Sequence, residues 1–233
     1  MHCGGVKFLS DGNGRPGVGD SGLDFARAVL ARGMEPVVRY YMDADHRWSD
    51  GNQYATEQYV KSGCRYIETI NEPDLDYEWS DDRLPKDWAR RAFDNWIDHA
   101  RRIVSLGGIP LSPALASGFL QARGDTAGQL TDNPFVWVKQ AGIPYFACSI
   151  HNYALNHPIA YPSDDVNQQG TPLTRAEWDR VGGAWAWDAQ PPELISQWRA
   201  SDANPGDTVR QDDSCFRACE VFRAMLNEAG YPD

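Results

Sequence analysis

The sequence has no surplus of positive charge and no long hydrophobic run. Its 233 residues include 22 lysines and arginines against 33 aspartates and glutamates, which gives a formal net charge of −11. An acidic surface repels phosphate backbones, so we expect no nucleic-acid partner. No apolar stretch approaches the ~20 residues of a membrane span, so we expect no membrane partner. The first residues lack the basic and apolar regions of a secretory signal, and the localisation stays open.

Cysteine is scarce and has no metal-binding pattern. None of the five cysteines forms a Cys-x-x-Cys pair, so a disulfide framework and a structural zinc site are both disfavoured. We expect no metal and no organic cofactor. An unrelated metal-dependent hydrolase stays as an alternative, although the spacing of its candidate ligands matches no known pattern. These ligands are Asp43, Asp45, His46, His151 and His157.

Aromatic residues are abundant, with nine tryptophans, ten tyrosines and eight phenylalanines. The mean hydropathy is nevertheless low, at −0.56. Two interpretations stay open: an ordinary aromatic core, or flat apolar faces beside water of the kind that sugar-binding clefts need. Four of the tryptophans lie in a proline-rich segment at 154–212. We expect this segment to be an irregular excursion from a single domain spanning 1–233.

Strand-like apolar runs alternate with helix-like segments along the chain. Strands are expected at 5–10, 35–42, 64–70, 109–115 and 143–150, and helices at 20–32, 53–62, 85–106, 134–140 and 213–229. This alternation predicts an α/β fold with parallel strands and crossover helices. A (β/α)8 barrel and an open doubly wound sheet both fit. The glycine-rich segment 11–19 matches neither phosphate-binding pattern, so we expect a plain loop there.

The strongest chemical signal is Glu68-Thr-Ile-Asn-Glu-Pro-Asp74, at the end of the third expected strand. Ligands bind at the carboxyl ends of parallel strands. We expect Pro73 to hold Glu72 in an extended conformation. We also expect strand alternation to set Glu68, Ile70 and Glu72 on one face. A carboxylate at this edge suits a general acid, and Asn71 suits a bond to a substrate hydroxyl.

A later segment, Ser149-Ile-His-Asn-Tyr153, ends the fifth expected strand. It brings His151 and Tyr153 to the same edge of the expected sheet. The two motifs, with Trp79 after the first, resemble the retaining glycoside hydrolases of clan A. The xylosidase/iduronidase-like family 39 is nearest in local pattern. The resemblance covers about residues 36–153, with specific identity at 68–79 and 149–153.

The resemblance implies a (β/α)8 barrel that hydrolyses O-glycosidic bonds of an oligo- or polysaccharide. The glutamate of Asn-Glu-Pro would be the general acid/base at the end of strand four. Carried over to this sequence, Glu72 is the acid/base and Glu68 is structural. Five residues would line the cleft around the sugar: Arg39, Asn71, Trp79, His151 and Tyr153.

The resemblance also exposes a gap. A retaining glycosidase needs a second carboxylate as nucleophile, which in the clan is a glutamate at the end of strand seven. With the Asn-Glu-Pro strand as strand four, the five expected strands are strands two to six. We therefore expect a partial barrel whose nucleophile lies beyond residue 233. No motif favours Asp11, Asp43 or Asp45 as a substitute. The alternative is a barrel that binds carbohydrate without cutting it. The sugar and the oligomeric state stay open.

Overall fold

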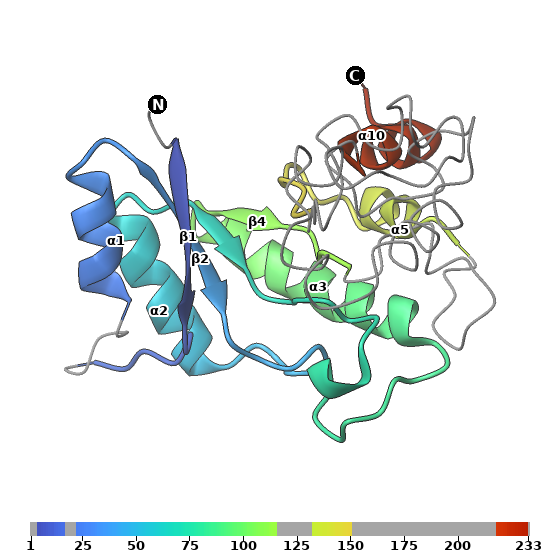
Figure 1. Cartoon of the computed structure of the whole chain (residues 1–233), viewed down its shortest axis with the longest axis horizontal. Helices are drawn as coiled ribbons and strands as arrows, with labels where there is room; N and C mark the ends of the chain where they lie inside the picture. The colour runs from blue at the N-terminus through green and yellow to red at the C-terminus, as the bar shows by residue number, and fades with distance from the viewer. Residues whose placement is uncertain (1–3, 17–21, 116–131, 151–217, 233) are drawn as a thin grey trace, which may run out of the picture. The chain divides into compact units, whose positions relative to one another are not determined.

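The computed structural model of the chain (Figure 1) describes residues 4–16, 22–115, 132–150 and 218–232. The chain divides into two compact units. One unit is Met1–Leu115 with Pro134–Ser149, and the other is Ala116–Asn133 with Ile150–Asp233. The expected excursion at 154–212 lies outside the described residues. The expected single domain therefore stays a prediction.

Four short strands form a parallel sheet whose spatial order follows the chain. They are β1 (Gly5–Ser10), β2 (Glu35–Tyr40), β3 (Tyr66–Glu68) and β4 (Ile109–Leu111). The first four expected strands are thus confirmed, although β3 and β4 are shorter than the apolar runs that predicted them. The fifth, at 143–150, is reduced to one parallel bridge between Leu111 and Ala147. It extends the sheet beside β4.

Helices alternate with these strands, as the sequence predicts (Figure 1). They are α1 (Leu23–Leu30), α2 (Asp50–Lys61), α3 (Trp88–Ser105) and α5 (Pro134–Gln140). Helix α2 begins three residues before the expected start because Ser49 caps it. The Ser49 hydroxyl accepts from Asn52 N at 3.2 Å, and the Asn52 side chain accepts from Ser49 N at 2.9 Å. This reciprocal capping box satisfies two backbone donors.

Helix α3 carries the apolar stripe that predicted it. Its inward-facing side chains at 88, 92, 96, 100 and 103 are each no more than 1% exposed. The indole Nε1 of Trp96 donates to the backbone oxygen of Leu111 at 2.7 Å. Because that oxygen lies at the end of β4, this bond fixes the helix against the sheet.

All three helices that follow β1, β2 and β3 pack on one face of the sheet. Val38 of β2 and its register partner Ile67 of β3 lie on this face. They share one buried core with side chains of the three helices: Leu23 and Ala26 of α1, Ala55 and Tyr59 of α2, and Ile103 of α3. The opposite face carries Arg39 and its register partner Glu68. The sheet therefore has an apolar helix-covered face and a second face that bears charge.

The second unit includes α10 (Ala218–Glu228), which confirms the described part of the helix expected at 213–229. Phe222 and Met225 are buried on it. Asn133 Nδ2 donates to the backbone oxygen of Met225 at 2.7 Å. Among the helices that the structure describes, none is long and apolar enough to span a bilayer.

Candidate active site

The Asn71-Glu72 pair lies just past the carboxyl end of β3, as predicted. The strand ends at Glu68, and the next three residues run on without ladder pairing. Strand alternation therefore stops before Glu72, and the expectation that it sets Ile70 and Glu72 on the face of Glu68 has no basis. All strands are parallel, so this edge also receives the loops that follow β1, β2 and β4.

The backbone of Glu72 departs from expectation. The prediction of an extended conformation before Pro73 is wrong, because Glu72 has a φ of +28°. Positive φ is rare for a residue with a side chain and is held only where surrounding contacts impose it. Two bonds supply that constraint. Leu75 N donates to Glu72 O at 3.0 Å, and Trp79 Nε1 donates to Pro73 O at 2.9 Å. The half-buried Glu72 side chain is thus carried on a tight turn.

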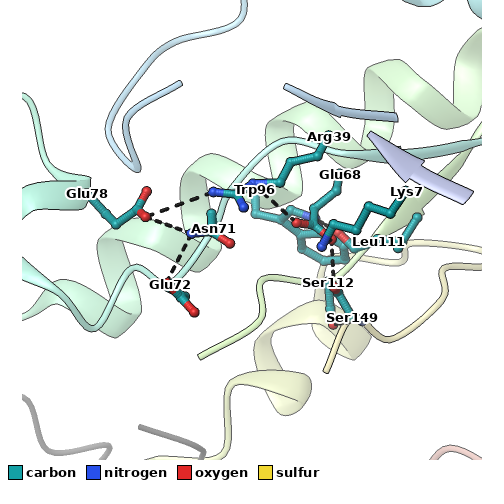
Figure 2. Close-up of polar contacts among 10 residues, drawn as sticks. All are labelled: Lys7, Arg39, Glu68, Asn71, Glu72, Glu78, Trp96, Leu111, Ser112 and Ser149. Atoms are coloured by element: carbon teal, nitrogen blue, oxygen red, sulfur yellow. Dashed lines mark hydrogen bonds and ion pairs between the residues drawn. The ribbon is translucent and has the colours of Figure 1, made fainter. Parts of the chain in front are cut away.

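Asn71 joins Glu72 to a second carboxylate, Glu78 (Figure 2). The amide Nδ2 of Asn71 donates to Glu78 Oε1 at 2.6 Å and to Glu72 Oε2 at 3.3 Å. Since both oxygens bond one nitrogen, they lie no more than about 6 Å apart. Asn71 is only 4% exposed. Its Oδ1 is buried with no hydrogen-bond partner among the described residues.

Glu78 is the site residue that sequence reasoning missed. It ends a short 3-10 helix, η1 (Asp76–Glu78), and its side chain is 16% exposed. Its backbone oxygen accepts from Ala44 N at 2.7 Å, which ties this loop to the loop after β2. Burial raises the pKa of the Glu78 carboxyl, although the Asn71 hydrogen bond opposes this shift. The only signal in the sequence was its position next to Trp79.

The raised pKa of Glu78 predicts a pH-dependent stability difference. Between its ordinary pKa of 4.5 and the higher pKa of the folded state, the unfolded chain binds fewer protons, so wild-type stability falls as pH rises. Glu78→Gln keeps an acceptor for Asn71 without the charge. We expect urea unfolding to give similar free energies of unfolding for wild type and Glu78→Gln below pH 4.5. At pH 7 we expect the variant to be more stable than wild type. If Glu78→Gln were no more stable than wild type at pH 7, this prediction would be wrong.

Arg39 lies between two carboxylates on the charged face of the sheet. Its Nε is 3.7 Å from Glu68 Oε1, and its terminal nitrogen is 4.0 Å from Glu78 Oε1. The side chain is 21% exposed. Arg39 therefore links the buried Glu68 to Glu78, the carboxylate that Asn71 bonds (Figure 2). Its predicted contact with a sugar stays a prediction.

Glu68 is the buried end of this network. It is fully buried and accepts from Lys7 Nζ at 2.7 Å and from Ser149 Oγ at 2.6 Å. Ser149 N in turn donates to Ser112 Oγ at 3.2 Å. Lys7 of β1 and Ser149, two residues after the bridge at Ala147, thus both bond this carboxylate, a structural role of the kind expected for Glu68. Ser149 begins the second predicted motif, whose His151 and Tyr153 lie outside the described residues.

Trp79 has a packing role in this structure. It is 2% exposed, its Nε1 bonds Pro73 O, and the Arg91 guanidinium lies 5.3 Å from its ring centroid. A cation over the ring face adds to the stability of the packing. The ring thus fixes the turn that carries Glu72. Its predicted contact with substrate stays a prediction.

A buried histidine supports the segment between β3 and Asn71. His99 of α3 is 0% exposed, and its Nδ1 lies 3.1 Å from the Thr69 hydroxyl. Burial lowers the pKa of His99 from its ordinary 6.5 to about 4. The folded protein therefore holds His99 neutral at pH 7. Thr69 lies two residues before Asn71, so the packing of His99 helps to set where the Asn71-Glu72 pair leaves the sheet.

The lowered pKa of His99 predicts acid sensitivity. As pH falls from 6.5 to 4, the unfolded state takes up a proton that the folded state excludes, so stability is lost across that window. A shift of this size corresponds to about 3 kcal/mol. We expect His99→Gln, which keeps a bond to Thr69, to lose less stability than wild type between pH 7 and pH 4. Urea unfolding at several pH values measures this, and parallel losses would contradict it.

Comparisons with known proteins add no assignment. The chain matches no protein-family model, and a search of curated proteins finds no match. Within the part of the chain that the structure describes, no three histidine, cysteine or acidic side chains are grouped so that they could hold a metal ion. The site is therefore characterised by its own geometry: a half-buried glutamate on a constrained turn, joined through a buried asparagine to a second carboxylate.

Proposed function

We propose that this chain is a glycoside hydrolase-like domain in which Glu72 is the general acid/base of a retaining double displacement on an O-glycosidic bond. The observation that carries the proposal is the Asn71-Glu72 pair. Glu72 lies at the ligand-binding edge of a parallel sheet, at a φ of +28°. Strained backbone of this kind clusters at functional sites. Asn71 beneath it is buried and bonded to both carboxylates.

The chemistry assigned to Glu72 has two halves. Its protonated carboxyl gives a proton to the glycosidic oxygen while a nucleophile bonds to the anomeric carbon and the bond from that carbon to the oxygen breaks. The resulting carboxylate then takes a proton from the water that releases the sugar. Asn71 and Arg39 are proposed to contact sugar hydroxyls, and His151, Tyr153 and Trp79 to line the subsite. No metal or organic cofactor takes part in these steps.

Glu78 is assigned a positioning role. Its Oε1 accepts a short bond from Asn71 and faces Arg39, so it holds the asparagine whose amide also reaches Glu72. We assign the nucleophile to none of the described residues. The domain is proposed to form part of a (β/α)8 barrel. Strands in chain order, with the helices on one face, support a barrel over a doubly wound sheet, which needs a switch point in strand order.

The test supplies a nucleophile from solution. The full 233-residue chain is incubated with sodium azide and a panel of phenyl and 4-nitrophenyl glycosides of xylose, glucose, galactose, mannose and arabinose, in both anomers. Azide attacks the anomeric carbon, the aryl-oxygen leaving group departs, and Glu72 supplies its proton. We expect azide-dependent release of the phenol and a glycosyl azide of inverted configuration, seen by NMR. Absence of azide-dependent cleavage across the panel would contradict the catalytic assignment.

The second candidate is a barrel that binds saccharides without cutting them. The observation that favours it is the engagement of Glu78 with Asn71 and Arg39, which leaves the described carboxylates without a free nucleophile beside Glu72. Calorimetric binding of an oligosaccharide, with no cleavage in the presence or absence of azide, would favour this candidate over the first.

A further inference from the structure

A pocket lies over the carboxyl ends of β1 and β2, and none of its lining residues is Asn71, Glu72 or Glu78. Its volume is about 420 Å³, within the range of small-ligand sites. The loop after β1 supplies Asp11 and Asn13, and the loop after β2 supplies Tyr41, Asp43 and His46. Met42, Ser49 and Asn52 complete the lining. The pocket thus combines carboxylates, an amide, an imidazole and one large aromatic ring.

The loop after β1, which supplies part of the pocket's lining, packs closely against Tyr40 of β2. Gly12 has a φ of +60°, and a Cβ there would lie 2.6 Å from the Tyr40 ring. The buried Asn52 donates from Nδ2 to Gly12 O at 2.6 Å, and Ser10 Oγ accepts from Gly12 N at 3.0 Å. The start of the glycine-rich segment, expected from sequence to be a plain loop, is therefore bonded in place against the start of α2.

A second glycine positions a polar group of the lining. A Cβ on Gly51, in the first turn of α2, would lie 2.2 Å from Asn13 Oδ1 and 3.2 Å from Asn13 Cα. Only glycine leaves room for Asn13 in this position. Glycine in a helix costs about 1 kcal/mol relative to alanine. The sequence thus has a poor helix former at a position where a side chain would displace Asn13.

The lining suits a polyhydroxylated ligand without negative charge. Tyr41 is 76% exposed, so its ring is available to an apolar sugar face. Carboxylates beside an amide and an imidazole suit hydrogen bonds to hydroxyl groups, whereas Asp11 and Asp43 would repel a phosphate. The pocket also adjoins the candidate active site. Asp43 acts electrostatically on Glu78, and Ala44, the next residue, donates its N–H to Glu78 O.

We propose that this pocket is a binding subsite for one neutral sugar ring, with Tyr41 stacked on the ring and Asp43 and His46 bonded to its hydroxyls. The proposal rests on the proposed function for its choice of ligand, because it names a subsite for the same saccharide. A sugar held here would occupy the edge over β1 and β2, beside Glu78.

Ligand-observed saturation-transfer NMR tests the proposal with D-xylose, D-glucose, D-galactose, D-mannose and L-arabinose. We expect at least one sugar to bind the full chain, and Tyr41→Ala to weaken it about tenfold. Tyr41→Trp should restore the stacking. Gly51→Ala should also weaken binding, because its Cβ displaces Asn13, while it leaves the fold intact by circular dichroism. Tyr145→Ala is the matched control, since Tyr145 is 45% exposed and does not line the pocket.

Three results would overturn the subsite: no sugar of the panel binds, Tyr41→Ala behaves like Tyr145→Ala, or Ca²⁺ rather than sugar is held by Asp11 and Asp43. The azide-dependent cleavage assay is run in parallel. If azide-dependent cleavage occurs but Tyr41→Ala does not change sugar binding, the subsite proposal is wrong and the catalytic proposal stands. Sugar binding that depends on Tyr41, with no cleavage, would remove the catalytic assignment and keep the subsite.

Discussion

Replacing Glu72 with glutamine is expected to slow azide-dependent cleavage of a phenyl glycoside by about 10²–10⁴-fold, the usual contribution of a general acid. Phenolate is a poor leaving group, so its departure depends on the proton that Glu72 supplies. Glutamine has the shape of glutamate, and a backbone φ of +28° is as unfavourable for glutamine as it is for glutamate. The substitution therefore removes the acid without changing the turn.

The control for this variant is Asp76→Asn. Asp76 is an exposed carboxylate of the same loop, and its side chain accepts only from the neighbouring Tyr77 N among the bonds that the structure describes for it. We expect Asp76→Asn to cleave at the wild-type rate. Circular dichroism and urea unfolding should show both variants folded. Equal rates for wild type and Glu72→Gln would contradict the role of Glu72.

Removing the Glu68 side chain is expected to destabilise the protein by about 1–3 kcal/mol, the cost of leaving buried hydrogen-bond partners unsatisfied. Glu68→Ala leaves Lys7 and Arg39 on one face without the carboxylate that they share. It also leaves the Ser149 hydroxyl without its acceptor. Urea unfolding followed by tryptophan fluorescence measures the effect. Glu68→Gln, which keeps an acceptor for Ser149, should lose less.

The matched control is an ion pair of similar length on the surface. Arg90 Nε lies 2.8 Å from Asp94 Oδ2, and both side chains are about half exposed. Exposed helix pairs contribute about 0.3–0.5 kcal/mol, so Asp94→Ala should have little effect. If Glu68→Ala destabilised the protein no more than Asp94→Ala, the buried Glu68 carboxylate would contribute no more to stability than an exposed ion pair does.

The sheet and its helices were accessible from sequence because their signals are local. The apolar runs of β1 and β2, the spaced tryptophans of α3 and the glycines that end α1 and α2 each predict an element by themselves. The residues at which the strands end were harder to predict from sequence. The run that predicted β3 continues to Ile70, but pairing stops at Glu68. The limit of a ladder depends on its neighbours as well as on its own residues.

The candidate site was predicted in part. The motif Asn71-Glu72-Pro73 identified the edge and the pair, since polar residues after a buried strand are a local pattern. The positive φ of Glu72 was missed because it is set by bonds from Leu75 and Trp79, which sequence does not display. Glu78 was missed for a similar reason. It reaches the site only because a 3-10 turn brings a carboxylate seven residues away back onto the Asn71 amide.

The pocket over β1 and β2 shows the same limit. Its residues come from two loops and a helix start, and only folding brings them together. The glycine-rich segment was visible in the sequence, but its purpose was not. A Cβ at Gly12 would clash with Tyr40, and a Cβ at Gly51 would clash with Asn13. These two positions therefore require glycine because of neighbours that only the folded structure brings close.

The central claim is that Glu72 gives a proton to a departing oxygen, and its most direct test is the leaving-group dependence of azide-rescued cleavage. Rates are compared for phenyl, 4-nitrophenyl and 2,4-dinitrophenyl glycosides with wild type and with Glu72→Gln. We expect the variant to be about 10²–10⁴-fold slower on the phenyl glycoside and less than about tenfold slower on the dinitrophenyl glycoside, whose leaving group needs no proton. An equal loss on all three substrates would contradict the account.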